Sequence, residues 1–289
     1  MARTKDPHAA TRKAWETRHR NARGEGSSAT QIRGDYAANA SSATVHRFER
    51  QGWTGPRKFE RGIDDPPMGS LMSEAAALKE TGLTLDQLAD VAGAPPGSEV
   101  AVRRLGGGGA EVVSKFPDEA GVSVRRIHTG RHAVGARRGV RFIHNLSFTV
   151  RVGRQGEGIG ADAFALEVES AVAHGFERIE VTAGGAGPAR LEKKGIGEIG
   201  PLFSHGRDPR AVDLAGYYAW ARMGFNSISK LPGPNGLAYL HDIMKKPGGP
   251  AWWKENGKAF VGVFDLTDGS TARRVHDEYL RLKRRQRNG

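Results

Sequence analysis

The sequence predicts a mixed fold of the α+β or α/β class, built on one mixed sheet. Three observations support that prediction. Four short segments with apolar residues at alternate positions follow one another between residues 99 and 150, which is typical of an antiparallel meander. The chain then passes through a strand, a glycine-rich loop, a helix and a further strand within residues 140–182. The first 70 residues show no sustained period, and we expect them to form a largely disordered basic arm.

The N-terminal arm, residues 1–70, holds thirteen Lys and Arg against eight Asp and Glu. Its apolar residues are scattered, so it cannot bury enough area to offset the entropy of ordering the chain. One short basic helix is expected at residues 9–20. Arg12, Lys13 and Arg18 in that helix are candidates for binding nucleic acid. The alternatives are a fully solvated arm and an arm that orders on a neighbouring subunit.

The main folded domain is expected over residues 71–272, after a proline-rich boundary. Two helices open it, at residues 71–80 and 84–92. Thr84 is expected to cap the second helix, because Gln87 stands three residues further on and completes the pattern of a capping box. The apolar face of this helix indicates ordinary packing.

The meander is expected to contain strands at residues 99–105, 110–116, 121–128 and 140–150. Four consecutive glycines at 106–109 join the first two strands. Such glycines are able to surround a phosphate, but their position between two alternating segments favours a hairpin turn.

A glycine-rich loop at residues 154–160 joins the last of these strands to a helix at 161–174, and a strand at 176–182 follows. Glycine lets a backbone approach a ligand closely, and the N–H groups that begin a helix suit a phosphate. The lysine of a Walker motif is absent, and the meander upstream does not fit a dinucleotide-binding sheet. The candidate cofactor-binding residues are Arg154, Gln155, Gly156, Gly158, Ile159 and Gly160.

Two motifs of this chain resemble the GNAT superfamily of acyl-CoA-dependent N-acyltransferases. The first is the Gln-x-x-Gly-x-Gly pattern at Gln155, Gly158 and Gly160, and the second is the helix-like segment at 216–226, which ends in Gly-Phe-Asn. The resemblance covers about residues 99–230 and implies a GNAT-like mixed sheet. It also implies that the loop binds the pyrophosphate of acetyl-CoA through backbone amides and that the acyl group passes to an amine.

Candidate catalytic residues come from the same resemblance. In that family an aromatic four residues before the Gly of Gly-Phe is often a tyrosine that protonates the departing thiolate. Here that position is Trp220, whose indole is no practical acid, and Tyr217 lies one turn away on the same face. The alternative is that these aromatic residues pack the core. The expected base is His144 or Glu180, although a single His on a strand is also often a packed or surface residue.

Further elements complete the expected domain. A helix is expected at residues 237–244, a strand at 259–266 and a last helix from 270 or 271 to about 285. A Gly-, Lys- and Arg-rich insertion at 184–210 separates the two motifs and is expected to shape an acceptor pocket. The basic C-terminal segment, residues 273–289, forms the last helix and a tail.

Composition limits the function. The chain has 289 residues, a net charge of +12 and no cysteine, which excludes disulfides, thiolate zinc sites and cysteine nucleophiles. No spacing typical of metal ligands occurs, and no apolar run is long enough to cross a membrane, so we expect neither a metal nor a membrane partner. The polar N-terminus does not match a secretory signal, and a cytoplasmic protein of a bacterial host cell is expected.

The positive charge favours anionic partners. Residues 121–154 hold eight Arg and no Asp or Glu, beside the proposed coenzyme loop. At the C-terminal end, Arg284 and Arg285 are candidates for contacting a phosphate backbone, although cations there also stabilise the helix dipole.

Two hypotheses therefore remain open. The first is a GNAT-fold enzyme that transfers an acetyl group from acetyl-CoA to an amine of unknown identity. The second is a catalytically inactive GNAT-like protein that serves a structural or nucleic-acid-binding role, as a component of a phage particle. Several stretches, Trp252 to Gly257 among them, are similar to uncharacterised bacterial and phage-encoded proteins with a GNAT-like core.

Overall fold

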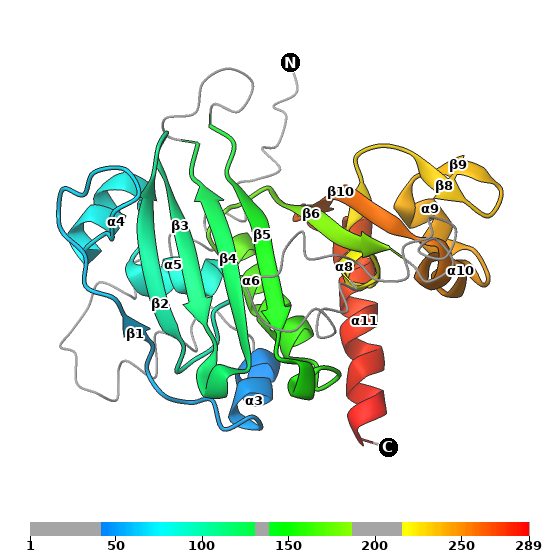
Figure 1. The fold of residues 1–289 in the computed structure, drawn as a ribbon, viewed down its shortest axis with the longest axis horizontal. Helices are drawn as coiled ribbons and strands as arrows, with labels where there is room; N and C mark the ends of the chain where they lie inside the picture. The colour runs from blue at the N-terminus through cyan, green and yellow to red at the C-terminus, as the bar shows by residue number, and fades with distance from the viewer. Residues whose placement is uncertain (1–41, 131–138, 187–215, 289) are drawn as a thin grey trace, which may run out of the picture.

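The computed structural model describes residues 42–130, 139–186 and 216–288 of the chain (Figure 1). The predicted helix at 9–20, with Arg12, Lys13 and Arg18, lies outside these residues. So does most of the 184–210 insertion.

The described chain forms a mixed α/β fold around an eight-stranded mixed sheet, as expected (Figure 1). The order across the sheet is β1-β2-β3-β4-β5-β6-β10-β7. Its strands are β1 Lys58–Phe59, β2 Glu99–Leu105, β3 Gly109–Lys115, β4 Gly121–His128, β5 Phe142–Val150, β6 Arg178–Ala186, β7 Asn226–Ser227 and β10 Lys258–Asp265. Strands β2 to β5 are antiparallel to one another, which confirms the meander.

The hairpin predicted at the four glycines is confirmed. Leu105 of β2 pairs with Gly109 of β3, and the turn between them places Gly107 and Gly108 at positive φ. Glycine adopts such angles without the steric cost that a Cβ atom would bring.

Strands β5 and β6 are parallel neighbours over only part of their length. Their register runs from Phe142 opposite Arg178 to Asn145 opposite Val181. Both strands continue beyond these pairs, β5 to Val150 and β6 to Ala186. The two strands therefore diverge after four paired residues, and we call this feature the β5–β6 divergence.

Helices cover one face of the sheet. In Figure 1, α5 (Leu85–Val91) and α6 (Ile159–Ala173) lie behind the central strands, and α4 (Glu74–Thr81) lies near the β2 edge. The predicted capping box of α5 is confirmed, since Thr84 and Gln87 exchange side-chain and backbone hydrogen bonds.

The opposite face of the sheet carries polar and exposed side chains. Arg126 is exposed, and Val261 is 46% exposed. Side chains alternate between the two faces along each strand, so these residues point away from the buried face.

Residues 42–70 correct the expected extent of the disordered arm. They form α3 (Ser42–Glu49) and β1, and they bury Phe48 and Trp53 at 0% and 3% exposure. The two rings pack in a cluster with Phe116, Ile159, Ala163 and Leu166, which come from distant parts of the chain. The composition of the segment hid this, because the residues that pack against Phe48 and Trp53 come from distant parts of the chain.

The C-terminal third differs in detail from the predicted elements. The helix expected at 237–244 is shorter and begins later, as α9 (Leu240–Lys245). The first two residues of the predicted range belong to β9 (Gly236–Ala238), which forms a hairpin with β8 (Leu231–Gly233). A further helix, α10 (Gly249–Asn256), was not predicted, because two glycines and a proline occupy its start. The last helix, α11 (Thr271–Asn288), is confirmed.

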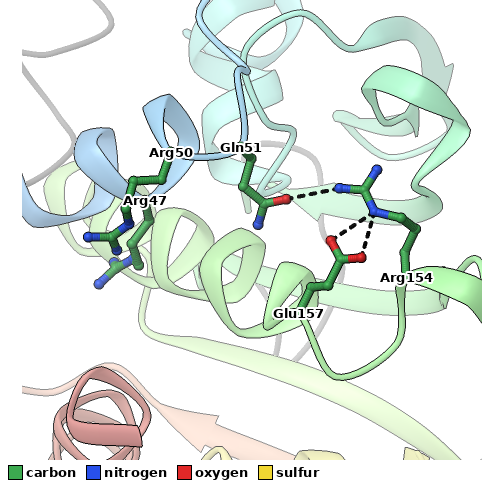
Figure 2. Close-up of a pocket in the computed structure, with 5 residues that line it drawn as sticks. All are labelled: Arg47, Arg50, Gln51, Arg154 and Glu157. Atoms are coloured by element: carbon green, nitrogen blue, oxygen red, sulfur yellow. Dashed lines mark hydrogen bonds and ion pairs between the residues drawn. The ribbon is translucent and has the colours of Figure 1, made fainter. Parts of the chain in front are cut away.

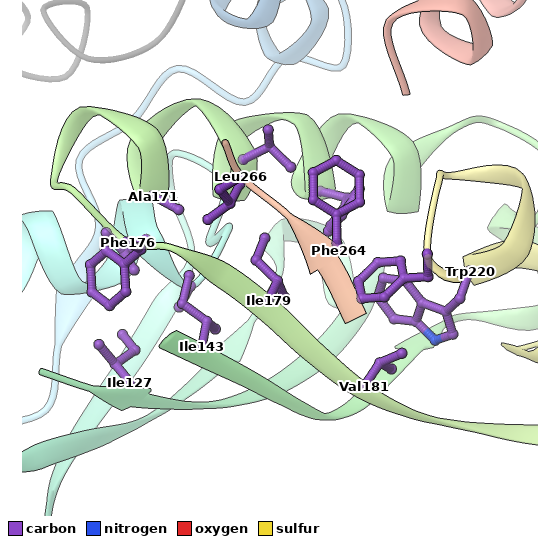
Figure 3. Close-up of a cluster of buried hydrophobic side chains, with 14 of the residues drawn as sticks. Ile127, Ile143, Ala171, Phe176, Ile179, Val181, Trp220, Phe264 and Leu266 are labelled. Atoms are coloured by element: carbon purple, nitrogen blue, oxygen red, sulfur yellow. The ribbon is translucent and has the colours of Figure 1, made fainter. Parts of the chain in front are cut away.

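The main core lies between the sheet and α6. Figure 3 shows side chains of β5, β6 and the end of β10, such as Ile143, Ile179 and Phe264, facing that layer. Phe164 of α6 meets the Phe264 ring edge to face, with centroids 5.2 Å apart. This packing fixes α6, and with it the loop that precedes α6.

Candidate functional site

The loop between β5 and α6 forms the centre of the candidate site. A 3-10 turn, η3 (Val152–Arg154), leads into it, and α6 starts at Ile159. Gly156 and Gly158 have φ angles of 86° and 85°. Gly158 is the N-cap of α6 in the left-handed region, which accounts for glycine at that position.

The first turn of α6 has backbone N–H groups suited to an anion. The N-cap residue Gly158 provides no side-chain hydrogen bond to them. The first N–H groups of a helix have no partner within the helix, and the helix dipole is positive at this end. An anion held at the loop would therefore accept hydrogen bonds from Ile159, Gly160 and Ala161.

The six predicted cofactor-binding residues have different surroundings. Gln155 and Gly156 are exposed, and a Cβ added to Gly156 would meet no atom within 4 Å. Ile159 is 1% exposed and packs in the core, so only its backbone is available to a ligand. A Cβ on Gly160 would lie 3.0 Å from the Phe148 ring, so glycine lets α6 approach β5 closely there.

Arg154 belongs to a surface pocket of about 360 Å³ beside the loop, which we call the arginine pocket. Its lining residues are Arg47, Arg50, Gln51, Arg154 and Glu157 (Figure 2). The Nε atom of Arg154 donates to both carboxylate oxygens of Glu157, at 2.9 and 2.8 Å. Its Nη2 atom donates to Gln51 Oε1 at 3.3 Å, which joins the loop to the chain after α3.

An acid in the first turn of α6 is neutralised from within the protein. Asp162 is buried, and its Oδ1 atom lies 3.1 Å from Arg47 Nε, with the two side chains 2% and 4% exposed. The carboxylate therefore does not present an uncompensated negative charge to an anion bound at the helix start.

His144 and Glu180 are brought together by the sheet. They are register partners on the parallel strands β5 and β6, one position before the last pair at the β5–β6 divergence. Their neighbours Ile143, Asn145 and Ile179 are buried, so alternation places both candidates on the sheet face opposite α6. Glu180 also accepts a hydrogen bond from Arg178 Nε at 2.8 Å.

Tyr217 and Trp220 lie on α8 (Gly216–Arg222) and are 5% and 8% exposed. The Tyr217 hydroxyl donates to the carbonyl of Lys254 at 2.5 Å, and its ring is close to Gly257. The Trp220 ring packs edge to face against Phe148 and Phe164, at 6.3 and 5.6 Å. Both side chains thus have the core packing that was the alternative to an acid role.

A buried polar cluster that was not predicted from the sequence lies next to the β5–β6 divergence. Arg125 of β4 places Nε 3.3 Å from Glu167 Oε2 of α6, with the side chains 1% and 0% exposed. Asn145 donates to the same oxygen at 3.3 Å, and Arg125 Nη1 donates to the Ser147 carbonyl at 2.7 Å. Burial raises the pKa of Glu167 and lowers that of Arg125, while the attraction within the pair opposes both shifts.

The sequence carries no clear signal for this cluster, because the apolar Val122 and Val124 lie on the outward face of β4 and Arg125 lies on the inward face. Arg125 occupies the same face of its strand as Gly121, Ser123 and Ile127, all of which are buried. An arginine on an inward face requires an acidic partner, because an unpaired buried charge is very costly. That partner, Glu167, comes from a helix 42 residues later, where it occupies a buried position.

The basic candidates of the C-terminal segment lie on α11. Arg284 and Arg285 are exposed, in a part of α11 that extends toward the C-terminus beyond the sheet (Figure 1). Arg281, one turn earlier, is 3.4 Å from Glu278. The exposed end of the helix is therefore strongly positive.

The described residues contain neither a cluster of metal ligands nor a membrane-spanning helix. Within residues 42–130, 139–186 and 216–288, no three His, Cys, Asp or Glu side chains are grouped as a metal site would require. No helix of the same part of the chain is long and apolar enough to cross a membrane.

In comparisons with known proteins, no family model, curated protein or solved structure matches this chain.

Proposed function

We propose that the chain is a GNAT-like acyltransferase, which binds acetyl-CoA at the β5–α6 loop and transfers the acetyl group to an amine. The observation that carries this proposal is the β5–β6 divergence, followed directly by a glycine-capped helix. A strand edge that loses its neighbour beside a helix start offers two kinds of backbone donor to one extended anionic ligand. The two sequence motifs of the GNAT superfamily point to the same ligand.

The loop accounts for the binding of the pyrophosphate. The uncapped N–H groups of Ile159 and Gly160 donate to its oxygens, and the dipole of α6 stabilises the negative charge. Gly156 and Gly158 allow the backbone to approach the ligand without a Cβ in the way.

The unpaired edge of β5 binds the pantetheine arm of the coenzyme. Beyond Asn145, residues up to Val150 pair with β4 but not with β6. The pantetheine arm of coenzyme A carries two amide groups, and an extended amide chain pairs with an unpaired strand edge. The arm is therefore directed from the loop toward His144.

His144 and Glu180 account for the chemistry. The amine nitrogen attacks the thioester carbonyl, the C–S bond breaks, and the nitrogen gives its proton to the imidazole of His144. The carboxylate of Glu180 stabilises the imidazolium that results, and the thiolate of coenzyme A takes a proton from solvent. Because Tyr217 is engaged by Lys254, most of the rate comes from holding donor and amine together.

Calorimetric titration of the full chain with acetyl-CoA tests the proposal. We expect binding in the micromolar range, and we expect Gly158→Val to weaken it about tenfold or more, because a β-branched residue cannot keep a positive φ. Gly269→Val is the matched control, since Gly269 has a φ of 70° at a turn remote from the loop. Absence of heat from wild-type protein at millimolar acetyl-CoA would refute the proposal.

A second candidate function is the binding of nucleic acid by a GNAT-like protein without catalysis, such as a component of a phage particle. The exposed arginines of α11 favour it, as does the packing role of Tyr217 and Trp220. We expect the double change of Arg284 and Arg285 to Gln to make the plot of log binding constant against log salt concentration less steep for duplex DNA. The decrease in slope should correspond to the loss of about two phosphate contacts. Anisotropy titrations at several salt concentrations measure this, with the exposed Arg61→Gln as control.

A further inference from the structure

The arginine pocket has a charge that suits an anionic ligand. Its lining contains three guanidinium groups and one carboxylate, and with Asp162, which pairs with Arg47, the net charge of the group is +1. The pocket adjoins the start of α6, and its side chains provide the groups that would contact a ligand. Guanidinium groups recognise phosphate through charge-assisted hydrogen bonds.

Two of the three arginines are fixed by partners within the protein. Arg47 is held by Asp162 of α6, and Arg154 is held by Glu157 and Gln51. The guanidinium of Arg154 also lies 5.9 Å from the centre of the Trp53 ring. These two residues form a preorganised wall rather than free charges.

Arg50 differs from them. It directly follows α3, and its backbone N–H donates to the carbonyl of His46. Its side chain is exposed and, within the part of the chain that the structure describes, makes no hydrogen bond or ion pair. The buried Phe48 anchors the adjacent helix, so this available charge is held beside the pocket.

The two ends of the pocket have different neighbours. Figure 2 shows Arg154 and Glu157 at one end, within the loop, and Arg47 and Arg50 at the other, on the α3 side. Coenzyme A carries two separate anionic groups on one ribose, a pyrophosphate on the 5′ side and a phosphate monoester on the 3′ side. A ligand with its pyrophosphate at the loop therefore has a second phosphate to place near α3.

We propose that the arginine pocket binds the 3′-phosphate of coenzyme A, with Arg50 as the residue that supplies the unpaired charge. This inference rests on the proposed function and adds to it a specificity for the 3′-phosphate. The protein then distinguishes coenzyme A from 3′-dephospho-coenzyme A, and α3, which lies outside the resemblance to acyltransferases, becomes part of the binding site.

The test compares the affinities of the full chain for coenzyme A and 3′-dephospho-coenzyme A by calorimetry. We expect wild-type protein to bind coenzyme A about tenfold or more tightly than the dephospho form, as for loss of a charge-assisted hydrogen bond. Arg50→Gln should bring the affinity for coenzyme A down to that for the dephospho form. Its affinity for the dephospho form should not change, which shows that the protein still folds.

Arg61→Gln is the control, because Arg61 is also exposed and does not line the pocket. This variant should keep the wild-type preference. Equal affinity of wild-type protein for the two ligands would overturn the inference and leave the proposed function standing. Failure of both ligands to bind would overturn the proposed function and this inference with it.

Discussion

His276 of α11 shows how burial controls the charge of a single residue. It is 2% exposed, and burial together with the charge of Arg47 lowers its pKa from 6.5 to about 3. Its ring lies edge to face against Phe164, with centroids 5.0 Å apart. The folded protein thus keeps this imidazole neutral at pH values where an unfolded chain would protonate it.

A pH dependence of stability follows. Between pH 6.5 and about 3 the unfolded state binds one more proton than the folded state at His276, so stability increases with pH across this range. The slope from this group is about 1.4 kcal/mol per pH unit, and it disappears above pH 6.5. We expect His276→Gln to remove that slope in urea unfolding curves at a series of pH values. An unchanged slope would contradict a neutral, buried His276.

Several arginines of residues 121–154 form ion pairs in the structure that their number in the sequence does not reveal. Their number predicts an anionic partner, yet Arg125 is paired with Glu167 inside the core, and Arg126 is 3.0 Å from Glu111. Arg154 is paired with Glu157. Each of these charges is thus neutralised by an acid, and the pairs Arg125–Glu167 and Arg126–Glu111 depend on how the strands and α6 pack, which composition does not contain.

At the scale of elements, the contact between Arg125 and Glu167 joins β4 to α6 beside the β5–β6 divergence. Removing one partner leaves the other charged and buried, so we expect Arg125→Met alone to lower the free energy of unfolding by about 3–5 kcal/mol. The double variant with Glu167→Leu should be more stable than the single variant, because it leaves no unpaired charge.

Urea unfolding of the two single variants and the double variant measures this coupling. The backbone at Gly93 packs tightly against α6 beside Glu167, since a Cβ at Gly93 would lie 2.5 Å from the carbonyl oxygen of Ala163. Simple addition of the two single losses in the double variant would mean that the pair is not coupled.

Elements with local signals were predictable from the sequence. The capping box at Thr84, the hairpin at the four glycines and strand β4 depend on neighbouring residues and appear where expected. Helix α3 was missed because Phe48 is stabilised by Phe116, Ile159 and other distant residues. Helix α10 was missed because its start, at Gly248 and Gly249, has a composition typical of a turn.

At the scale of the whole molecule, the sheet topology places His144 beside Glu180, and strand β5 leads from His144 to the glycine-rich loop. The loop and the glycines were visible as a motif, but the pairing of His144 with Glu180 depends on the parallel register of β5 and β6. The arginine pocket depends on α3 packing beside α6. Both arise from contacts over long sequence separations, which a local pattern does not specify.

The central claim is that the first turn of α6 binds the phosphates of acetyl-CoA. Amide hydrogen exchange of the full chain with and without millimolar acetyl-CoA tests it most directly, because the claim names the N–H groups involved. We predict slower exchange at Ile159, Gly160 and Ala161 and unchanged exchange at the first turn of α5, which Thr84 already caps. Unchanged exchange at all three amides, with the ligand at a saturating concentration, would contradict the claim.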